Sequence, residues 1–454
     1  MPGIRKFPIG GTHLPENKDL TTGSPIRALD PPARVVIPLK QHLGVPCKPI
    51  VSPGERVSVG QLIGANKEGL SARIHSSIRG TVTAIERHSM VDHSECDCVI
   101  IERDQNTDNQ TPAPDSRTPI KGPDAPVPDA DTVRERVEEA GIVGMGGAAF
   151  PTHVKLQVRK DTPIDSVIIN GAECEPFITT DDRLMQERAA ELFRGLEIIR
   201  ITVGARTGYV ACEINKPEAI KRIVEESARW PHLEAVRLDT RYPHGAEKHL
   251  VKAVLDREVP IRQLPMSVGV LVNNVQTAIA VTDAVDHGIA VTSRVLTVSG
   301  SVVSHPGNFQ VPLGMSLGDL VAAAGGPAED DYRLVVGGPM TGILTDDFSI
   351  PVTKSTSGVV LIRPGEYADR SAEVCIRCGR CVSVCPMYLQ PNRITTFVRN
   401  DMTEEAEEFG VNDCILCGAC SFVCPSRRPL LQWLREGKAK SAVLADDRRR
   451  RNPV

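Results

Sequence analysis

Eight of the chain's cysteines stand in two runs of identical spacing near its C-terminal end. Each run reads Cys-x2-Cys-x2-Cys-x3-Cys-Pro, and the two runs are Cys375, Cys378, Cys381 and Cys385, then Cys414, Cys417, Cys420 and Cys424. Two-cluster bacterial ferredoxins have this spacing, which presents soft thiolates to iron–sulfur clusters. The sequence therefore predicts two [4Fe–4S] clusters and one-electron transfer.

The spacing also predicts which cysteines share a cluster. The three closely spaced cysteines of a run can hold one face of a cubane, but the fourth lies too far along the chain and binds the neighbouring cluster. The predicted ligands of the first cluster are Cys375, Cys378, Cys381 and Cys424, and those of the second are Cys414, Cys417, Cys420 and Cys385. Two structural zinc sites are the alternative, although such sites usually use pairs of Cys or Cys with His.

A glycine-rich loop, GMGGAAFPTHVK at residues 144–155, is the second segment with residues suited to chemistry. Gly144, Gly146 and Gly147 allow backbone N–H groups to surround a phosphate, and Lys155 adds a positive charge. The loop is not the GxGxxG fingerprint of dinucleotide-binding folds, and a helix rather than a strand is predicted before it. A phosphate site and a simple tight turn are the two interpretations.

An acidic segment, NGAECEP at residues 170–176, follows a predicted buried strand. It places Asn170, Glu173 and Glu175 at the C-terminal end of that strand, where ligands bind in parallel α/β sheets. Carboxylates there can accept hydrogen bonds from ribose hydroxyls or from a nicotinamide amide. Helix capping and turn formation are the alternative roles for these side chains.

Composition and charge argue against several classes of protein. The 454 residues include 53 Lys and Arg and 57 Asp and Glu, and only 4% are aromatic. Nucleic-acid-binding proteins usually have a basic excess or aromatic platforms, so no nucleic acid is expected. No apolar run reaches the ~18 residues of a membrane span, and the first residues lack a secretory signal. We therefore predict a cytoplasmic protein, in which clustered cysteines bind metal rather than form disulfides.

The predicted elements divide the chain into β-rich and α/β parts. Residues 1–30 form an extended arm, and residues 31–104 are short strands separated by Gly and Pro, as in a small β-barrel or sandwich. From residue 129 to 290 strands alternate with helices, which predicts a mostly parallel sheet covered by helices. The remaining parts are a Pro-rich linker at 105–128, short strands again at 291–350, the cysteine motifs within 365–435, and a charged tail at 436–454.

Several motifs together resemble one protein family. The segments 144–155 and 170–185 are similar to the NADH- and FMN-binding subunit of respiratory complex I, and still more to the RnfC subunit of the Rnf ion-translocating ferredoxin:NAD oxidoreductases. The similarity extends to YPHGAEK at 242–248, to NNVQT at 273–277 and to the two cysteine runs. It also covers the front of the chain, in GGTHLPENK, IPLKQHLG and GTVTAIERH.

The resemblance implies a fold and a set of binding residues. The implied fold is a multidomain α/β chain: a β barrel-sandwich-like module at 31–104, an FMN/NADH-binding α/β domain at 129–290, a soluble-ligand-binding β-grasp domain at 291–350, and an α-helical and loop two-cluster ferredoxin-like domain at 365–435. The implied roles are phosphate and ribityl binding by Gly144, Gly146, Gly147 and Lys155, a ring site lined by Asn170, Glu173 and Glu175, and closure by Asn273 and Asn274. Phe150 is expected to stack on nicotinamide or adenine, with Glu247 near the nicotinamide.

Two positions depart from the family pattern. Ala246 replaces an acidic residue beside Glu247. Ala149 stands where many relatives have Gly, and because Ala favours a negative φ, the loop is expected to differ there.

The implied function is that of the NAD(H)-facing subunit of an Rnf complex, peripheral on the cytoplasmic side of the cell membrane. It would move electrons between NAD(H) as substrate, FMN, two [4Fe–4S] clusters and membrane-embedded partner subunits that translocate an ion. Ferredoxin would be the ultimate donor or acceptor, through another subunit, and no residue is expected to act as a catalytic acid or base. The alternatives are a stand-alone NADH-dependent flavin and iron–sulfur reductase, similar to cobalamin reductases, and a non-catalytic cluster-bearing scaffold. Neither cysteine run indicates which cluster meets the partner.

Overall fold

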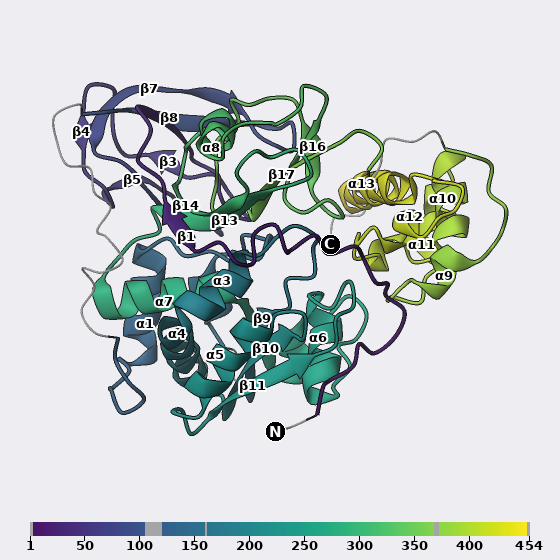
Figure 1. Cartoon of the computed structure of the whole chain (residues 1–454), viewed down its shortest axis with the longest axis horizontal. Helices are drawn as coiled ribbons and strands as arrows, with labels where there is room; N and C mark the ends of the chain where they lie inside the picture. Colours follow the sequence, from purple (N-terminus) through teal and green to yellow (C-terminus); the bar gives the residue numbers. More distant parts are fainter. Residues whose placement is uncertain (1–2, 105–119, 159–160, 367–371, 452–454) are drawn as a thin grey trace.

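A four-stranded parallel sheet forms the centre of the middle part of the chain (Figure 1). The computed structural model describes residues 3–104, 120–158, 161–366 and 372–451. The strand order is β11-β10-β9-β12, and every neighbouring pair is parallel, as predicted. The strands are β9 (Ser166–Gly171), β10 (Thr207–Glu213), β11 (Leu233–Leu238) and β12 (Val270–Asn274).

Helices cover both faces of this sheet because its strands are apolar on both faces. In β9, Val167 and Ile169 point into one core, and Ile168 points into the other. On the first face lie α1 (Ala130–Glu139), α3 (Thr180–Glu187), α4 (Ala189–Thr202), α5 (Pro217–Ser227) and α7 (Val275–His287). On the second face lies α6 (Glu247–Leu255). We call residues 129–290 the central domain.

Two small antiparallel sheets form the N-terminal β domain. Alternate residues of β2 (Arg34–Pro38) and β8 (Glu95–Arg103) point to the same side, so Val35, Ile37, Val99 and Ile101 fill one core. The four-stranded sheet has the order β2-β8-β7-β4 and the three-stranded sheet the order β3-β5-β6. The strands are β2 (Arg34–Pro38), β3 (Lys48–Pro49), β4 (Arg56–Val57), β5 (Leu62–Ala65), β6 (Ile74–His75), β7 (Gly80–Ser89) and β8 (Glu95–Arg103). Most of the predicted Pro-rich linker, residues 105–119, lies outside the described residues.

A six-stranded sheet forms the second β domain, in the order β1-β14-β13-β17-β15-β16. This sheet includes strands from outside residues 291–350, the bounds expected for the β-grasp domain. One edge strand, β1 (Ile26–Ala28), comes from the N-terminal arm and pairs with β14, and the sheet continues past residue 350 to β17 (Gly358–Ile362). The other elements are β13 (Ser293–Ser299), β14 (Gly307–Pro312), α8 (Leu317–Ala323), β15 (Arg333–Val336) and β16 (Ile343–Thr345).

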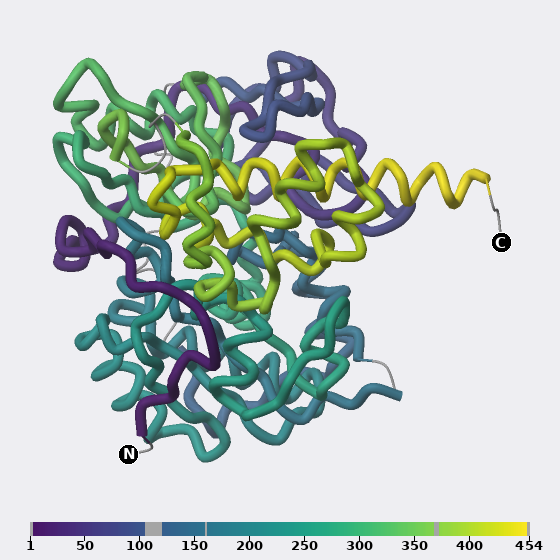
Figure 2. Tube along the Cα trace, turned by 90° about the vertical axis from the view of Figure 1, so that its right-hand side faces the viewer, coloured from purple at the N-terminus to yellow at the C-terminus, as the bar shows by residue number. Residues whose placement is uncertain are grey.

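The C-terminal part, which we call the cysteine domain (residues 372–451), is helical. Residues 436–451, expected as part of a separate charged tail, instead continue one helix, α13 (Leu430–Arg451), which extends beyond the rest of the molecule in Figure 2. Acidic residues of α11 (Thr403–Glu408) contact this helix, since Arg448 pairs with Glu404 at 2.9 Å and with Glu407 at 2.8 Å. The other elements are α9 (Arg380–Ser383), α10 (Pro391–Arg399), α11 (Thr403–Glu408) and α12 (Ala419–Phe422).

The N-terminal arm joins three of these parts (Figure 2). Its Arg5 N–H donates to the Arg237 carbonyl of β11 at 2.8 Å, and its Gly11 N–H donates to the Val384 carbonyl of the cysteine domain at 2.9 Å. The arm then ends as β1 in the second β domain. Among the described residues, no helix has the length and apolar character of a membrane span.

Candidate functional site

One cavity borders every residue predicted to hold FMN or NAD(H). Its volume is about 1410 Å3, and it lies at the C-terminal ends of β9 and β12, beside the start of α7. This is where parallel α/β sheets bind ligands. The predicted residues on its wall are Gly144, Gly146, Gly147, Phe150, Lys155, Asn170, Glu173, Glu175, Glu247, Asn273 and Asn274.

The glycine loop is a closed turn whose tip faces the cavity. The Gly144 N–H donates to the Phe150 carbonyl at 2.8 Å, and the Met145 N–H donates to Thr277 Oγ1 of α7 at 2.9 Å. Gly147 has a φ of 119°, which favours glycine, and a Cβ added there would meet nothing within 4 Å. A Cβ on Gly146 would come within 3.2 Å of Asn274. The loop therefore leaves an open backbone cradle that a larger side chain would fill.

The expectation for Ala149 was wrong, because this residue adopts a φ of 50°. The left-handed conformation costs a non-glycine residue about 1–2 kcal/mol, and glycine loses about 0.4–1 kcal/mol more entropy on folding. We therefore expect Ala149→Gly to raise the free energy of unfolding by about 0.5–1 kcal/mol, measured by chemical denaturation. Ala148→Gly is the control, since Ala148 has no positive φ, and it should not stabilise. An equal gain in the free energy of unfolding in both variants would show that the backbone of Ala149 is not strained.

Lys155, the last residue of the loop, contacts both β12 and α6. Lys155 donates to the Val272 carbonyl and lies 3.6 Å from the Glu247 carboxylate. The Asn273 side chain is 5% exposed, and its Nδ2 has no hydrogen-bond partner among the described residues. A buried amide normally has a partner. An unpaired donor, a cation and an open backbone cradle on one cavity fit a bound phosphate and a polar ring.

Asn274 and the two acidic-loop carboxylates border the cavity but already have protein partners. Asn274 caps α7 and donates to Asp181 at 2.7 Å. Glu173 accepts hydrogen bonds from the N–H groups of Asp181 and Asp182, at the start of α3. Glu175 accepts from the Met340 N–H at 3.0 Å and from Thr341. The alternative role predicted for this segment, helix capping, thus applies to Glu173, and Glu175 ties the central domain to the second β domain.

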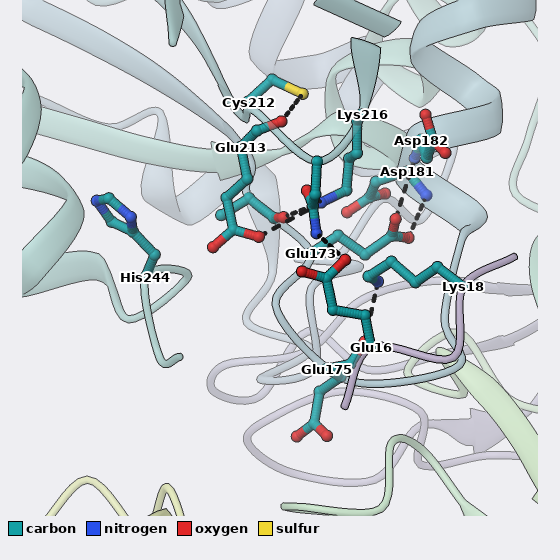
Figure 3. A network of polar contacts seen from close by, with 12 residues as sticks. Glu16, Lys18, Glu173, Glu175, Asp181, Asp182, Cys212, Glu213, Lys216 and His244 are labelled. Carbon is teal, nitrogen blue, oxygen red and sulfur yellow. Dashed lines mark hydrogen bonds and ion pairs between the residues drawn. The ribbon is translucent and has the colours of Figure 1, made fainter. Parts of the chain in front are cut away.

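A buried charge network that was not predicted holds the acidic loop (Figure 3). Lys18, from the N-terminal arm, donates to the carbonyls of Glu175 and Ile178. Lys216 donates to the Ala172 carbonyl at 2.6 Å and lies 3.4 Å from Glu213. Burial raises the pKa of Glu173 to about 8, although Lys18 opposes this shift. The two lysines thus fix the main chain on both sides of the loop.

Arg294 lies on the cavity wall and was not predicted from the sequence. It comes from β13, is 3% exposed, and donates to the Met145 carbonyl of the glycine loop at 3.1 Å. Burial lowers its pKa to about 10, against the opposing charge of Asp181. The signal available in the sequence was an arginine within the otherwise uncharged strand β13, because a charged side chain is rarely buried without a partner.

The two cysteine runs have the same backbone shape. Positive φ angles recur at matching positions, with Arg377 at 57° and Leu416 at 54°, and with Gly379 and Gly418 both at 76°. Each glycine precedes a short helix, α9 or α12. The internal repeat seen in the sequence is therefore also a structural repeat.

The fourth cysteine of the first run lies with the second run. Cys385, Cys414, Cys417 and Cys420 border one small cavity. Burial raises the pKa of Cys414, and the nearby Cys385 adds to this rise. Burial likewise raises the pKa of Cys381, and the nearby Cys424 and Cys378 add to it. In the part of the chain that the structure describes, no three His, Cys, Asp or Glu side chains surround a single metal ion site. The arrangement fits the predicted crossing of ligands between two clusters.

The cysteine domain docks on the central domain beside the second run. Cys417 borders both the small cysteine cavity and the large cavity. Tyr242 Oη donates to the Cys417 carbonyl at 2.6 Å, and His249 Nε2 lies 2.9 Å from the Pro386 carbonyl. The backbone next to two predicted ligands of the second cluster is thus held by the central domain.

Comparison with known families identifies each part of the chain. Residues 6–106 match the RnfC barrel sandwich hybrid domain, and residues 137–283 match the Nuo51 FMN-binding domain. Residues 295–344 match the SLBB domain, and residues 371–428 match the 4Fe–4S dicluster domain. These matches confirm the predicted multidomain α/β fold, FMN and the two [4Fe–4S] clusters, and the match to the dicluster domain favours these clusters over the zinc alternative.

Relatives match over almost the whole chain. The subunit designated C in the proton-translocating ferredoxin:NAD(+) oxidoreductase complex of Clostridium ljungdahlii is 38% identical over 96% of this chain and 94% of that protein. Its counterpart in the Na(+)-translocating complex of Acetobacterium woodii is 37% identical, over 97% of this chain and 98% of that protein. The counterpart in the ion-translocating oxidoreductase complex of Rhodobacter capsulatus is 39% identical over 96% of this chain and 84% of that protein. The chain therefore belongs to the RnfC family, whose members are subunits of the Rnf ion-translocating ferredoxin:NAD⁺ oxidoreductase complexes.

Proposed function

We propose that this subunit passes electrons between NAD(H) and the membrane-embedded subunits of an Rnf complex. When bound, FMN supplies the exchange between the two-electron chemistry of NAD(H) and the one-electron chemistry of iron–sulfur clusters. The observation that carries the proposal is the cavity of about 1410 Å3, which has the glycine loop on its wall and also reaches Cys417. Nucleotide site and cluster site are thus adjacent within one chain.

We assign the polar residues of the cavity to binding and positioning rather than to acid–base chemistry. The open N–H groups of the glycine loop and Lys155 suit a phosphate, and Asn273 suits a polar ring edge. Phe150 and Glu247 border the same cavity, and we assign these two residues to the binding of NAD(H). Glu173 and Glu175 act through the loop conformation that their hydrogen bonds maintain.

We assign the second cluster, held by Cys385 and the second run, to the position nearest the flavin. Its support is Cys417 on the cavity wall and the hydrogen bond from Tyr242. The relatives are named as subunits of ferredoxin:NAD⁺ oxidoreductase complexes that translocate protons or Na⁺. We therefore place this subunit peripherally on the cytoplasmic side of the membrane, with ferredoxin reached through another subunit.

Loss of the Tyr242 hydroxyl should weaken the contact between the central domain and the cysteine domain at Cys417. Tyr242→Phe leaves the Cys417 carbonyl without its donor in a partly buried contact, which costs about 1–3 kcal/mol. We expect NADH to bleach the flavin at an unchanged rate, while cluster bleaching becomes slower, both followed by stopped-flow absorbance. Tyr332→Phe, in the second β domain, is the matched control and should leave both phases unchanged. If the clusters of Tyr242→Phe bleached at the wild-type rate, the hydrogen bond from Tyr242 would not position the second cluster.

Reconstitution with FMN, iron and sulfide under anaerobic conditions tests the proposed function. NADH should bleach first the flavin and then the cluster absorbance. Gly147→Val, which strains a φ of 119° and fills the cradle, should abolish FMN binding and leave the iron content unchanged. Gly122→Val is the control, because a Cβ there meets nothing within 4 Å and its φ is ordinary. Bound flavin that does not react with NADH would instead support the non-catalytic scaffold.

A further inference from the structure

Exposed apolar side chains stand beside the predicted cluster ligands of the cysteine domain. Val374 is 87% exposed, Ile376 is 68% exposed and Tyr388 is 73% exposed. Val382 and Phe422 are exposed nearby. Val374 and Ile376 stand on either side of Cys375, and neighbouring exposed apolar side chains are typical of protein–protein contacts. We call these five residues the exit face.

The two predicted clusters differ in their access to this face. Cys378, a predicted ligand of the first cluster, is exposed, whereas Cys420, a predicted ligand of the second cluster, is buried. Cys417, a predicted ligand of the second cluster, borders the large cavity, whereas no cysteine of the first run does. An electron that leaves the chain therefore has its most accessible exit at the first cluster.

Three exposed arginines outnumber the one exposed acidic residue beside Val374 of the exit face, Glu373. Arg377, Arg380 and Arg427 are exposed, and none of them forms an ion pair with another residue in the described ranges. Other arginines of the cysteine domain are engaged, since Arg393 stacks on Phe409 and Arg399 on Trp433. A basic rim around an apolar centre is complementary to an acidic protein surface.

We propose that the exit face docks an acidic protein that carries a one-electron cofactor, and that the first cluster is the one that meets this partner. The inference rests on the proposed function and adds to it the partner-facing cluster and the chemistry of the partner surface. In the step itself, one electron moves between the first cluster and the partner cofactor, with one oxidised and the other reduced. No bond forms or breaks, and no proton is transferred.

An acidic two-cluster ferredoxin, used as a stand-in for the partner subunit, tests the docking. The full chain is reconstituted, reduced with dithionite and freed of excess dithionite, and it is then mixed with oxidised ferredoxin while the second-order rate is measured at low and high salt. We expect the wild-type rate to fall as salt rises. The variant Arg377→Glu/Arg380→Glu/Arg427→Glu should be about tenfold slower at low salt and should lose the salt dependence.

A control variant separates local charge from total charge. Arg56→Glu/Arg206→Glu/Arg222→Glu changes three exposed arginines of the N-terminal β domain and the central domain, and it should exchange electrons like the wild type. Equal slowing in both variants, or none in the first, would overturn the proposal. So would binding of the wild type, but not of the first variant, to vesicles of anionic phospholipid with no effect on the ferredoxin rate.

The same samples distinguish this inference from the proposed function. Reduction of the clusters by NADH inside the chain should be unchanged in the Arg377→Glu/Arg380→Glu/Arg427→Glu variant. If NADH fails to reduce the wild-type clusters, the proposed function fails, while exchange between dithionite-reduced chain and ferredoxin still reports on the exit face.

Discussion

Cys385→Ser should remove the second cluster and interrupt electron transfer between the flavin and the first cluster. The expected iron content falls from about eight to about four atoms per chain, since each predicted cluster holds four. NADH should still bleach the flavin, but the remaining first cluster should stay oxidised on the timescale of turnover. The reason is geometric, because Cys385 shares a cavity with Cys414, Cys417 and Cys420 rather than with its own run. Iron analysis, EPR and stopped-flow absorbance measure these three outcomes.

Cys424→Ser is the matched variant, because it should remove the first cluster instead. Iron again falls to about four atoms per chain, but NADH should still reduce the remaining cluster, which lies next to the cavity. Cys98→Ser, at a buried cysteine outside both runs, should keep both clusters. If Cys385→Ser and Cys424→Ser behaved in the opposite sense, the crossing of ligands between the runs would be wrong.

Lys216→Met should cause the largest loss of stability in the central domain. Lys216 Nζ lies 3.4 Å from the Glu213 carboxylate, and both side chains are almost fully buried. Burial alone would lower the pKa of Lys216, but the nearby Glu213 carboxylate raises it, so the lysine is charged. Removing one partner of a buried ion pair costs about 3–5 kcal/mol, because the other charge stays buried without compensation. Chemical denaturation of the full chain measures this loss in the transition of the central domain.

Two further variants make this prediction specific. Lys221→Met, at an exposed lysine of α5, should change stability by less than about 0.5 kcal/mol. The double variant Glu213→Gln/Lys216→Met removes both charges and should recover a large part of the loss, as the network in Figure 3 indicates. A loss in Lys216→Met as small as that in Lys221→Met would contradict the role of the network.

Local spacing explains why part of the site could be predicted from the sequence. The ligand pattern of a cubane is set over a dozen residues, so the crossing of Cys385 and Cys424 follows from the two runs alone. The glycine loop likewise needs small residues where its backbone faces the cavity. The alternation of strands and helices predicted the parallel sheet, and hence the edge at which Asn170 and Asn273 both border the cavity.

Contacts between distant segments explain what the sequence did not predict. Lys18 reaches the acidic loop from the N-terminal arm, and Glu175 finds its partners at Met340 and Thr341 of another domain. No periodicity or spacing encodes such pairs. The helix α13 was missed for a similar reason, because Arg448 looks like part of a solvated tail until Glu404 of α11 is placed beside it.

Single-turnover reduction by NADH is the most direct test of the central claim that one chain contains the path from nucleotide to clusters. The reconstituted full chain is mixed anaerobically with less than one equivalent of NADH, and flavin and cluster absorbance are recorded at several protein concentrations. The structure predicts that the flavin is reduced first, and that the clusters follow at a rate independent of protein concentration. A cluster phase that becomes faster in proportion to protein concentration, or no cluster phase, would contradict an internal path.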